Sequence, residues 1–279
     1  MSSLALAAAL LVTVQAPDTV IDARRGDRVV IELVTGDVAI SAWERDAVEV
    51  RASSGGGPVG LRRSGSAIQV VPSESRGRAR SVDATLRVPR WIDLEIGSRS
   101  LDLSVTGTAG AIRVGNVSGD VRIQDVAGPV EVRSIRGEIE IIDARGGVRA
   151  SSQGDDVVLT RVSGSVEAHS GDGDIVLQDV RSEAVRVEAQ DGDVSFSGTI
   201  APGGDYGFYV HDGDATIAVP AETSAQVSVS TFDGEFQSDF TVRVESFTSG
   251  RGFDFMLGDG SARIRIEVFD GEIRLLRSR

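Results

Sequence analysis

Short acidic turns are the feature of this sequence best suited to binding a metal ion. Each turn places one carboxylate on either side of a glycine, and the turns span Asp172 to Asp174, Asp191 to Asp193, Asp212 to Asp214, Asp233 to Glu235 and Asp270 to Glu272. Carboxylate oxygens are preferred ligands of Ca²⁺, and in some repeat proteins the turns of adjacent coils share an ion. The candidate calcium ligands are Asp172, Asp174, Asp191, Asp193, Asp212 and Asp214. Aspartate and glycine also form turns readily, so turn formation and solubility explain the same pattern, and we expect no cofactor.

Groups suited to catalysis are sparse. The chain contains no lysine and no cysteine, and its two histidines, His169 and His211, lie far apart in the sequence. The adjacent Asp155 and Asp156 would point to opposite faces of a strand, so this pair alone cannot form a two-carboxylate site. The sequence has neither a Gly-x-Ser-x-Gly nucleophile motif nor a glycine-rich phosphate loop. We therefore expect a protein that is not an enzyme and has no catalytic residues.

The composition favours many short strands joined by tight turns. The 279 residues include 33 glycines and 7 prolines, 41% are hydrophobic and 5% are aromatic. This balance suits strands rich in Val and Ile. The formal net charge of -13 leaves no basic surplus with which to bind a phosphate backbone, so we expect no nucleic-acid partner.

The first residues are typical of an export signal. Leu4 to Val14 is apolar apart from Thr13, which fits a short signal-peptide core and is too short to cross a membrane. A small-residue site ends at Ala16, so we expect a signal peptide over 1–16. Because no later segment is apolar enough to span a bilayer, the mature chain is expected to have no transmembrane segment and to lie outside the cytoplasm. Periplasm, cell surface and secretion all remain open.

A near-constant internal repeat organises the middle of the chain. Its strong segments are Gly119-Asp120-Val121-Arg122-Ile123, Gly137-Glu138-Ile139-Glu140-Ile141, Asp155-Asp156-Val157-Val158-Leu159, Gly173-Asp174-Ile175-Val176-Leu177 and Gly192-Asp193-Val194-Ser195-Phe196. Weaker half-repeats lie between them. Apolar and polar residues alternate within each segment, as in a strand with one buried face, so each repeat holds two strands.

A near-constant repeat favours a coil over a meander of hairpins, because only a coil places the same position above itself at every turn. The predicted fold is an all-β, single-stranded parallel β-solenoid (β-helix) with about 18 to 21 residues per coil. It forms a single domain over 17–279; a β-sandwich or barrel is the alternative. One corner then carries an acidic column: Asp120, Glu138, Asp155 or Asp156, Asp174, Asp193, Asp214 and Glu235.

The coils are expected to widen toward the C-terminus. The turns at Gly192, Gly213, Gly234 and Gly260 follow one another at longer intervals than the segments of the central repeat, and all nine Phe fall in this half. Large side chains would fill the wider core and form a C-terminal cap over about 234–279. An alternative is an exposed aromatic surface for a partner, for which the candidate residues are Arg251, Phe253 and Phe255.

The N-terminal part is less regular. Gly36 to Ile40 looks like part of a first coil that Trp43 would cap, and polar, turn-rich breaks predict irregular loops over about 51–82. A cap is needed because a solenoid otherwise leaves an open strand ladder at its end.

Three sequence segments resemble the bacterial β-strand-repeat family labelled "putative adhesin", a domain family of unknown function. They are Gly36 to Ile40 with Trp43 and Val48-Glu49-Val50, the segment Leu86-Arg87-Val88-Pro89-Arg90, and the Ser-Gly-Asp-Val repeats that follow. The resemblance covers about 30 to 279. It implies a cell-envelope β-solenoid and supplies no catalytic residues.

These observations together predict a non-catalytic, extracytoplasmic β-solenoid that acts as an adhesin-like or scaffold module at the cell envelope. Its partner would be an envelope component, glycan or protein, and the chain is expected to be a monomer. Two alternatives stay open: a self-assembling structural protein similar to bactofilins, and a calcium-binding or glycan-active β-helix protein.

Overall fold

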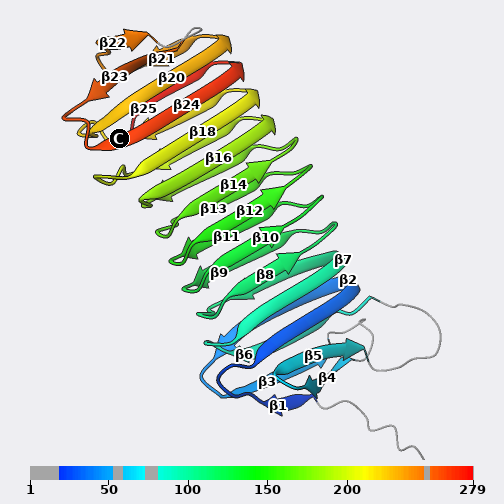
Figure 1. Cartoon of the computed structure of the whole chain (residues 1–279). Helices are drawn as coiled ribbons and strands as arrows, with labels where there is room; N and C mark the ends of the chain where they lie inside the picture. The colour runs from blue at the N-terminus through cyan, green and yellow to red at the C-terminus, as the bar shows by residue number, and fades with distance from the viewer. Residues whose placement is uncertain (1–18, 53–58, 73–80, 248–251, 279) are drawn as a thin grey trace, which may run out of the picture.

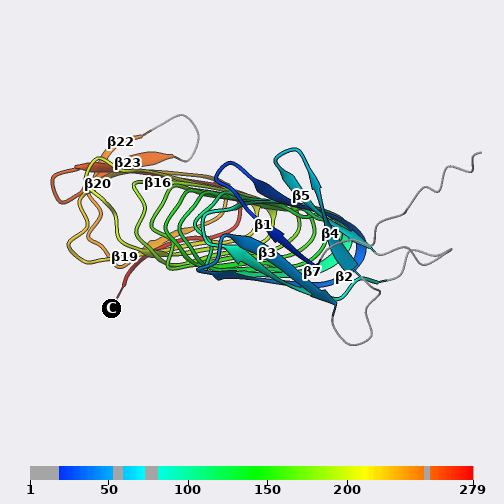
Figure 2. The ribbon, with the colours of Figure 1, turned by 90° about the horizontal axis from the view of Figure 1, so that it is seen from below.

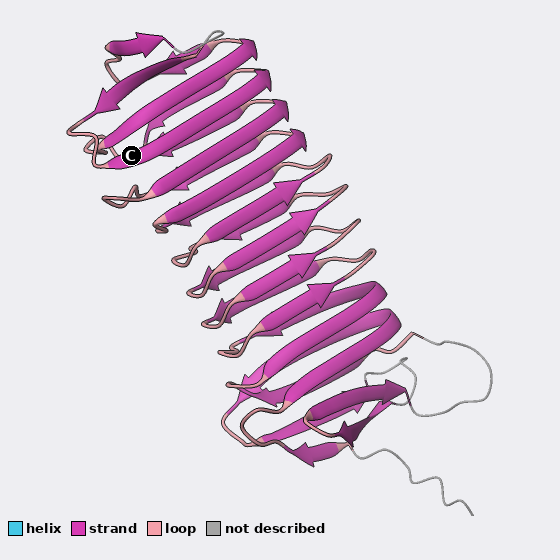
Figure 3. Cartoon of the chain, viewed as in Figure 1, coloured by secondary structure: helices cyan, strands magenta, loops and turns pink. Residues whose placement is uncertain are grey.

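The structure, a computed structural model, describes residues 19–52, 59–72, 81–247 and 252–278, and in these ranges it contains strands and loops but no helix (Figure 3). The strands stack into a long, flattened body with two layers (Figures 1 and 2). Most strand pairs are parallel. The predictions of an all-β chain and of mainly parallel pairing are confirmed.

Each coil in the middle of the stack contributes one strand to each layer. Layer A contains β8 (Ile112–Gly115), β10 (Val130–Arg133), β12 (Val148–Ser152), β14 (Val166–Ser170), β16 (Ala184–Asp191) and β18 (Asp205–Asp212). Layer B contains β9 (Val121–Val126), β11 (Ile139–Ala144), β13 (Val157–Thr160), β15 (Ile175–Val180), β17 (Val194–Gly198) and β19 (Ala215–Val219). Val121 pairs with Ile139, and the backbone N–H of Glu138 donates to the carboxylate of Asp120.

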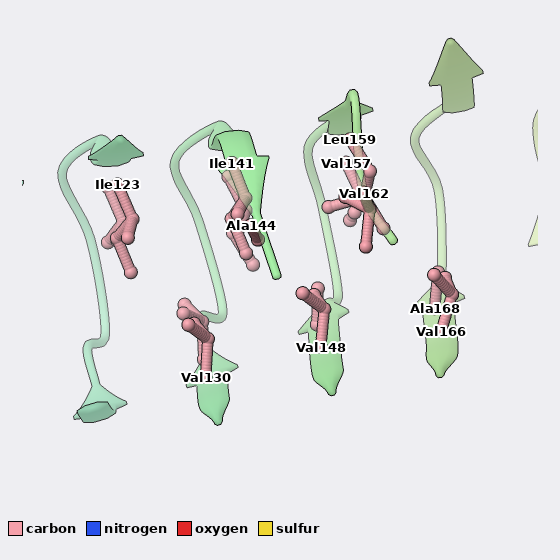
Figure 4. Packing of buried hydrophobic residues seen from close by; sticks show 14 of the residues in the cluster. Ile123, Val130, Ile141, Ala144, Val148, Val157, Leu159, Val162, Val166 and Ala168 are labelled. Atoms are coloured by element: carbon pink, nitrogen blue, oxygen red, sulfur yellow. The ribbon is translucent and has the colours of Figure 1, made fainter. Parts of the chain in front are cut away.

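The core lies between the two layers. Alternate residues of each strand point inward, so valine, isoleucine and leucine side chains from facing strands meet there (Figure 4). Those of layer A include Val130, Val148, Val166 and Ala168; those of layer B include Ile123, Ile141, Ala144, Val157 and Leu159. The same positions recur in every coil and form continuous apolar columns along the stack.

Both corners of the central coils require special backbone conformations. Four residues near the ends of layer B strands have positive φ angles of 51 to 56°: Asp125, Asp143 and Asp179, each next to last in its strand, and Arg161, which directly follows β13. Aspartate tolerates this left-handed conformation better than most side chains do. At the other corner, Gly119 and Gly137 have positive φ angles of 100 and 120°. At the first corner, glycine also avoids a clash. A Cβ on Gly146 would overlap the carbonyl oxygen of Gly128 and lie 2.9 Å from the nitrogen of Pro129.

The N-terminal end begins with two long strands, β2 (Arg28–Trp43) and β7 (Asp93–Thr106), which run through both layers and pair with each other. The far side of β2 is covered by β5 (Ala67–Pro72) in layer A and by β6 (Ala84–Pro89) in layer B. Three antiparallel strands complete this end: β4 (Val59–Ser64) on β5, β3 (Ala47–Ala52) on β6, and β1 (Val20–Asp22) on β3.

This arrangement corrects the prediction of irregular loops over about 51–82. Residues 59–72 form the hairpin β4–β5 and bury Leu61 and Ile68, because the apolar residues alternate there as they do in the coils. Residues 53–58 and 73–80 lie outside the described residues. Trp43 is half-buried and donates its indole N–H to the carbonyl oxygen of Ala47 at 2.7 Å, which braces the turn from β2 to β3.

The C-terminal end departs from the predicted order of coils. Its strands are β20 (Ala225–Asp233), β21 (Phe236–Ser238), β22 (Val244–Phe247), β23 (Phe253–Leu257), β24 (Ala262–Asp270) and β25 (Ile273–Arg277). The last coil, β24 and β25, is inserted between the coil of β18 and β19 and that of β20 and β21. β23 then adds antiparallel to β20, and β22 to β23.

The expected order of the acidic column, with Glu235 directly after Asp214, is therefore wrong. A Cβ on Gly271 would contact Gly213, and one on Gly234 would contact Gly271, so the spatial order is Gly213, Gly271, Gly234. The cap predicted over about 234–279 is wrong for β24 and β25, because this last coil lies inside the stack. The strands β21 to β23, in the first part of that range, lie at the end together with β20. The three Asp-Gly-Asp/Glu turns are equivalent in sequence, which hides their spatial order.

Candidate binding surface

The acidic column holds adjacent coils together. In spatial order it consists of Asp83, Asp37, Asp102, Asp120, Glu138, Asp156, Asp174, Asp193, Asp214, Glu272 and Glu235. Carboxylates in this column accept the backbone N–H of the residue above them: Asp156 from Asp174 at 2.9 Å, and Asp174 from Asp193 at 2.9 Å. Of the two predicted alternatives, Asp156 occupies the column, while Asp155 accepts the N–H of Gly137 at 2.8 Å.

Burial, together with the stacking of like charges, raises the pKa of two members of the column. Burial and the neighbouring carboxylates of Glu140, Asp120 and Asp156 raise the pKa of Glu138. Burial and the carboxylates of Asp83 and Asp102 similarly raise the pKa of Asp37. The charged forms of these two side chains are thus disfavoured in the folded chain.

The predicted calcium ligands fall in two neighbouring rows. Asp174, Asp193 and Asp214 belong to the acidic column, while Asp172, Asp191 and Asp212 are exposed at the edge of layer A. Among the residues that the structure describes, no group of three or more His, Cys, Asp or Glu side chains is arranged to hold a metal ion. Calcium binding stays a prediction for these six residues.

The aromatic surface predicted near the C-terminus is wrong for Phe255. This side chain is 0% exposed, since β23 lies against β20 and turns Phe255 toward the core. Phe253 is half-buried, and its ring packs 5.3 Å from that of Phe236, so it helps to close the end of the stack. Arg251 lies outside the described residues.

The outer face of layer A carries a ladder of alternating charge. In spatial order its members are Glu95, Arg113, Glu131, Arg149, Glu167 and Arg186. Arg149 forms an ion pair with Glu167 at 2.5 Å, and its hydrogen bond, with one from His169, lowers the pKa of Glu167. His169 contacts Glu188 at 3.1 Å on its other side. Because each side chain lies beside one of opposite charge, the ladder is ordered and carries little net charge.

A groove of about 480 Å³ runs beside this ladder. It crosses the starts of the layer A strands, where one column holds only small side chains or proline: Ala111, Pro129, Gly147, Ser165 and Ala184. The long ladder side chains rise beside these short ones, which leaves the hollow.

The groove ends at Tyr209. Gly207 lies under its ring, since a Cβ on Gly207 would lie 2.9 Å from Cε2 of Tyr209. The guanidinium of Arg186 lies 4.8 Å from the ring centre, and Nη1 of Arg265 donates to the tyrosine hydroxyl at 3.3 Å. Two cations thus fix the ring at the mouth of the groove.

Beyond Tyr209 the surface bears aromatic rings that sequence reasoning missed. Phe232 is 68% exposed and Phe269 is 49% exposed; their rings stack 4.9 Å apart, and His211 stacks on Phe269 at 4.9 Å. Each occupies the position just before an Asp-Gly-Asp/Glu turn, where the alternation of the strand points outward. Aligning the turns would have revealed this column.

Comparisons with known proteins place the chain beside a named family. The model of the family described as Toastrack DUF4097 matches residues 27–276. No curated protein matches the chain. In the described part of the chain, no helix is long and apolar enough to cross a membrane.

Three solved structures are similar over most of their length. A "putative adhesin" from Bacteroides fragilis has 12% identity, with 92% of this chain and 94% of that chain covered and a TM-score of 0.44. A "putative adhesin" from Parabacteroides distasonis also has 12% identity and the same coverage, with a TM-score of 0.34. A "putative cell adhesion protein" from Clostridium sporogenes has 10% identity, 95% and 100% coverage, and a TM-score of 0.25.

Proposed function

The chain belongs to the Toastrack DUF4097 family, and from this premise we propose that it is a non-catalytic binding module, adhesin-like or scaffold-like, at the outside of the bacterial cell envelope. The binding surface in this proposal is the outer face of layer A. Its ligand would be an envelope component, either a glycan or a protein.

The observation that carries the proposal is the groove beside the charge ladder. Its lining comes from strands paired on both sides, from β8 to β18, so the groove is formed before any ligand arrives. A preformed site loses little conformational entropy on binding. The alternating Glu and Arg side chains offer donors and acceptors at the regular spacing of the strands, about 4.8 Å, which suits an extended, repetitive ligand.

Filling the groove tests the proposal. Ala184→Trp places a large ring among the small lining residues, at an exposed position that leaves the core untouched. Ser195→Trp is the matched control, because Ser195 is also exposed but lies on β17 in layer B. Binding to isolated cell envelope, measured by co-sedimentation, should fall at least about tenfold for Ala184→Trp and stay unchanged for the control. Equal binding by both variants, or no binding by the native chain, would refute the proposal.

Self-assembly similar to that of bactofilins is the second candidate. End-to-end growth of a parallel stack needs open parallel edges, whereas here antiparallel strands lie at both ends: β1, β3 and β4 at one, and β22 and β23 at the other. This arrangement supports a monomer. Filaments in negative-stain images of the purified chain would favour assembly instead.

Two further tests address the remaining alternatives. If calcium bridges the acidic turns, excess chelator should lower the melting temperature by several degrees, and an unchanged melt would exclude that role. Reproducible cleavage of any member of a polysaccharide panel would show a glycan-active enzyme. Export is tested by fractionation of cells that produce the full chain, which should place the protein outside the cytoplasm.

A further inference from the structure

The exposed aromatic column crosses three paired strands at the C-terminal end of layer A. Its rings, in spatial order, belong to His211, Phe269 and Phe232, on β18, β24 and β20, and Gln190 on the neighbouring β16 continues the row without a ring. The rings of Phe269 and Phe232 are nearly parallel, at 2°, and His211 stacks on Phe269, so the three rings form one stack. A hollow of about 340 Å³ lies along it and reaches back to Tyr209. Two exposed phenylalanines side by side form an apolar surface patch whose exposure to water is unfavourable.

A row of aspartates follows this column along its full length. Asp191, Asp212, Asp270 and Asp233 are the next residues in the same four strands, they pair with one another, and all four are exposed. In the described part of the chain, no arginine forms an ion pair with Asp191, Asp212 or Asp270. This row differs from the charge ladder, where opposite charges alternate, and from the acidic column, where carboxylates accept backbone N–H groups.

The two rows together are complementary to one kind of partner. The carboxylates of Asp191, Asp212 and Asp270 lie one strand spacing apart, about 4.8 Å, and have no ion-paired arginine among the described residues, so they repel one another and attract cations. The adjoining rings favour apolar side chains. The net charge of -13 adds long-range attraction for a cation and repulsion for nucleic acid or an anionic lipid surface. The surface therefore fits a segment with basic side chains beside apolar ones.

We propose that the Phe232–Phe269–His211 column and its aspartate row bind a cationic amphipathic helix of a partner protein. This inference rests on the proposed function as a binding module and names the class of partner. Three strand intervals span about 14 Å, the length of about ten helical residues. Side chains on one face of a helix recur once per turn, at a spacing close to the distance between neighbouring strands of this sheet. Side chains on one face of an extended strand are spaced more widely, so a helix matches the rows of this surface better than a strand does.

Fluorescence anisotropy with synthetic peptides and the full chain tests this proposal. The probe is a labelled helical peptide with arginine on one face and leucine on the other, and the control peptide has serine in place of leucine. The aromatic variant is Phe232→Ser with Phe269→Ser, and its matched control is Ile135→Ser, at a 43% exposed apolar position remote from the column. The acidic variant is Asp212→Asn with Asp270→Asn. Its control, Glu32→Gln with Glu44→Gln, makes the same charge change at exposed sites near the other end.

We expect the arginine–leucine peptide to bind, and to bind at least about tenfold more weakly to the aromatic variant. The acidic variant should bind more weakly and with a flatter dependence on salt, while both controls stay within about twofold of the native chain. No binding of the probe, equal binding of the arginine–serine peptide, or native affinity in the aromatic variant would overturn the proposal. Unchanged melting temperatures establish that the variants are folded.

The envelope assay separates this inference from the proposed function. If the probe does not bind but Ala184→Trp still abolishes binding of the chain to envelope, the helix-binding site is refuted and the binding module stands. If the probe binds the aromatic column but the native chain does not bind envelope, the site stands and the envelope function is refuted.

Discussion

The corner aspartates act mainly through one acceptor oxygen. Asp174 accepts the backbone N–H of Asp193 and donates its own N–H to Asp156, so each aspartate links two coils. A short side chain is needed, because the acceptor must reach a backbone group one strand away. The recurrence of Gly-Asp before β9, β15, β17 and β19 follows from this local requirement and does not by itself point to a metal site.

We predict that Asp174→Ala lowers the free energy of unfolding by about 1 kcal/mol, because the N–H of Asp193 loses its acceptor. Asp174→Asn should be nearly neutral, since the amide oxygen still accepts that N–H and one like charge leaves the column. Urea denaturation measures both. Equal losses in the two variants would mean that the charge, and not the hydrogen bond, is what stabilises the corner.

Glu138 should show the opposite pH behaviour from a salt-bridged carboxylate. Its pKa is raised in the folded chain above its ordinary value of 4.5, so its neutral form is favoured by folding and its contribution to stability is lost as pH rises through the folded pKa. Glu138→Gln keeps the neutral form at every pH. We predict that the variant is slightly more stable than the native chain near pH 7, by less than about 1 kcal/mol because solvent screens this exposed side chain, and that the difference disappears below about pH 4.

The control for this prediction is Glu140→Gln. Glu140 forms an ion pair with Arg122, so its replacement should bring no gain in stability near pH 7. Urea denaturation at the two pH values measures both variants. A gain for Glu138→Gln that persists unchanged in acid would show that repulsion within the acidic column is not its cause.

At the scale of the strand and corner, much of the fold could be predicted from the sequence. The alternation in Val121-Arg122-Ile123 and its return at Ile139-Glu140-Ile141 predict parallel, register-matched strands, and these residues pair accordingly. The exposed rings were missed because Phe232 and Phe269 were assigned to a wider core along with the other phenylalanines. Their place in the alternation, after inward-facing Thr231 and Val268, carries the correct information.

The stacked glycine corner should tolerate no side chain. We predict that Gly146→Ala lowers the free energy of unfolding by about 2 kcal/mol or more, because its Cβ would overlap the carbonyl oxygen of Gly128 and the backbone there is held on both sides. Gly115→Ala is the matched control: a Cβ at that position meets no atom within 4 Å, so stability should stay level or rise by up to about 1 kcal/mol. Similar losses in both variants would argue against close stacking as the reason for the glycine.

At the scale of the whole molecule, the spatial order of strands at both ends differs from their order in the sequence, and the repeat pattern does not predict this difference. Near the N-terminus, β2 lies between β7 and the later strands β5 and β6, and near the C-terminus, β24 lies between β18 and the earlier strand β20. Equivalent repeats fit equally well in either order along the stack, so periodicity cannot choose between them. The reversal places antiparallel strands at the two ends of the body.

Hydrogen exchange should show that the last coil lies inside the stack. In a solenoid that stacks in sequence order, the last coil is held on one side and frays first, but here the amides of Ala262–Asp270 lie between two paired strands. We predict that β24 exchanges as slowly as central strands such as β12, whereas β22 and β23, which precede it in the chain, exchange much faster. Mass spectrometry of peptides covering these segments measures the rates. If β24 exchanged as fast as β23, the last coil would have to lie at the end of the stack, and the aromatic column, which needs Phe269 beside Phe232, would not exist.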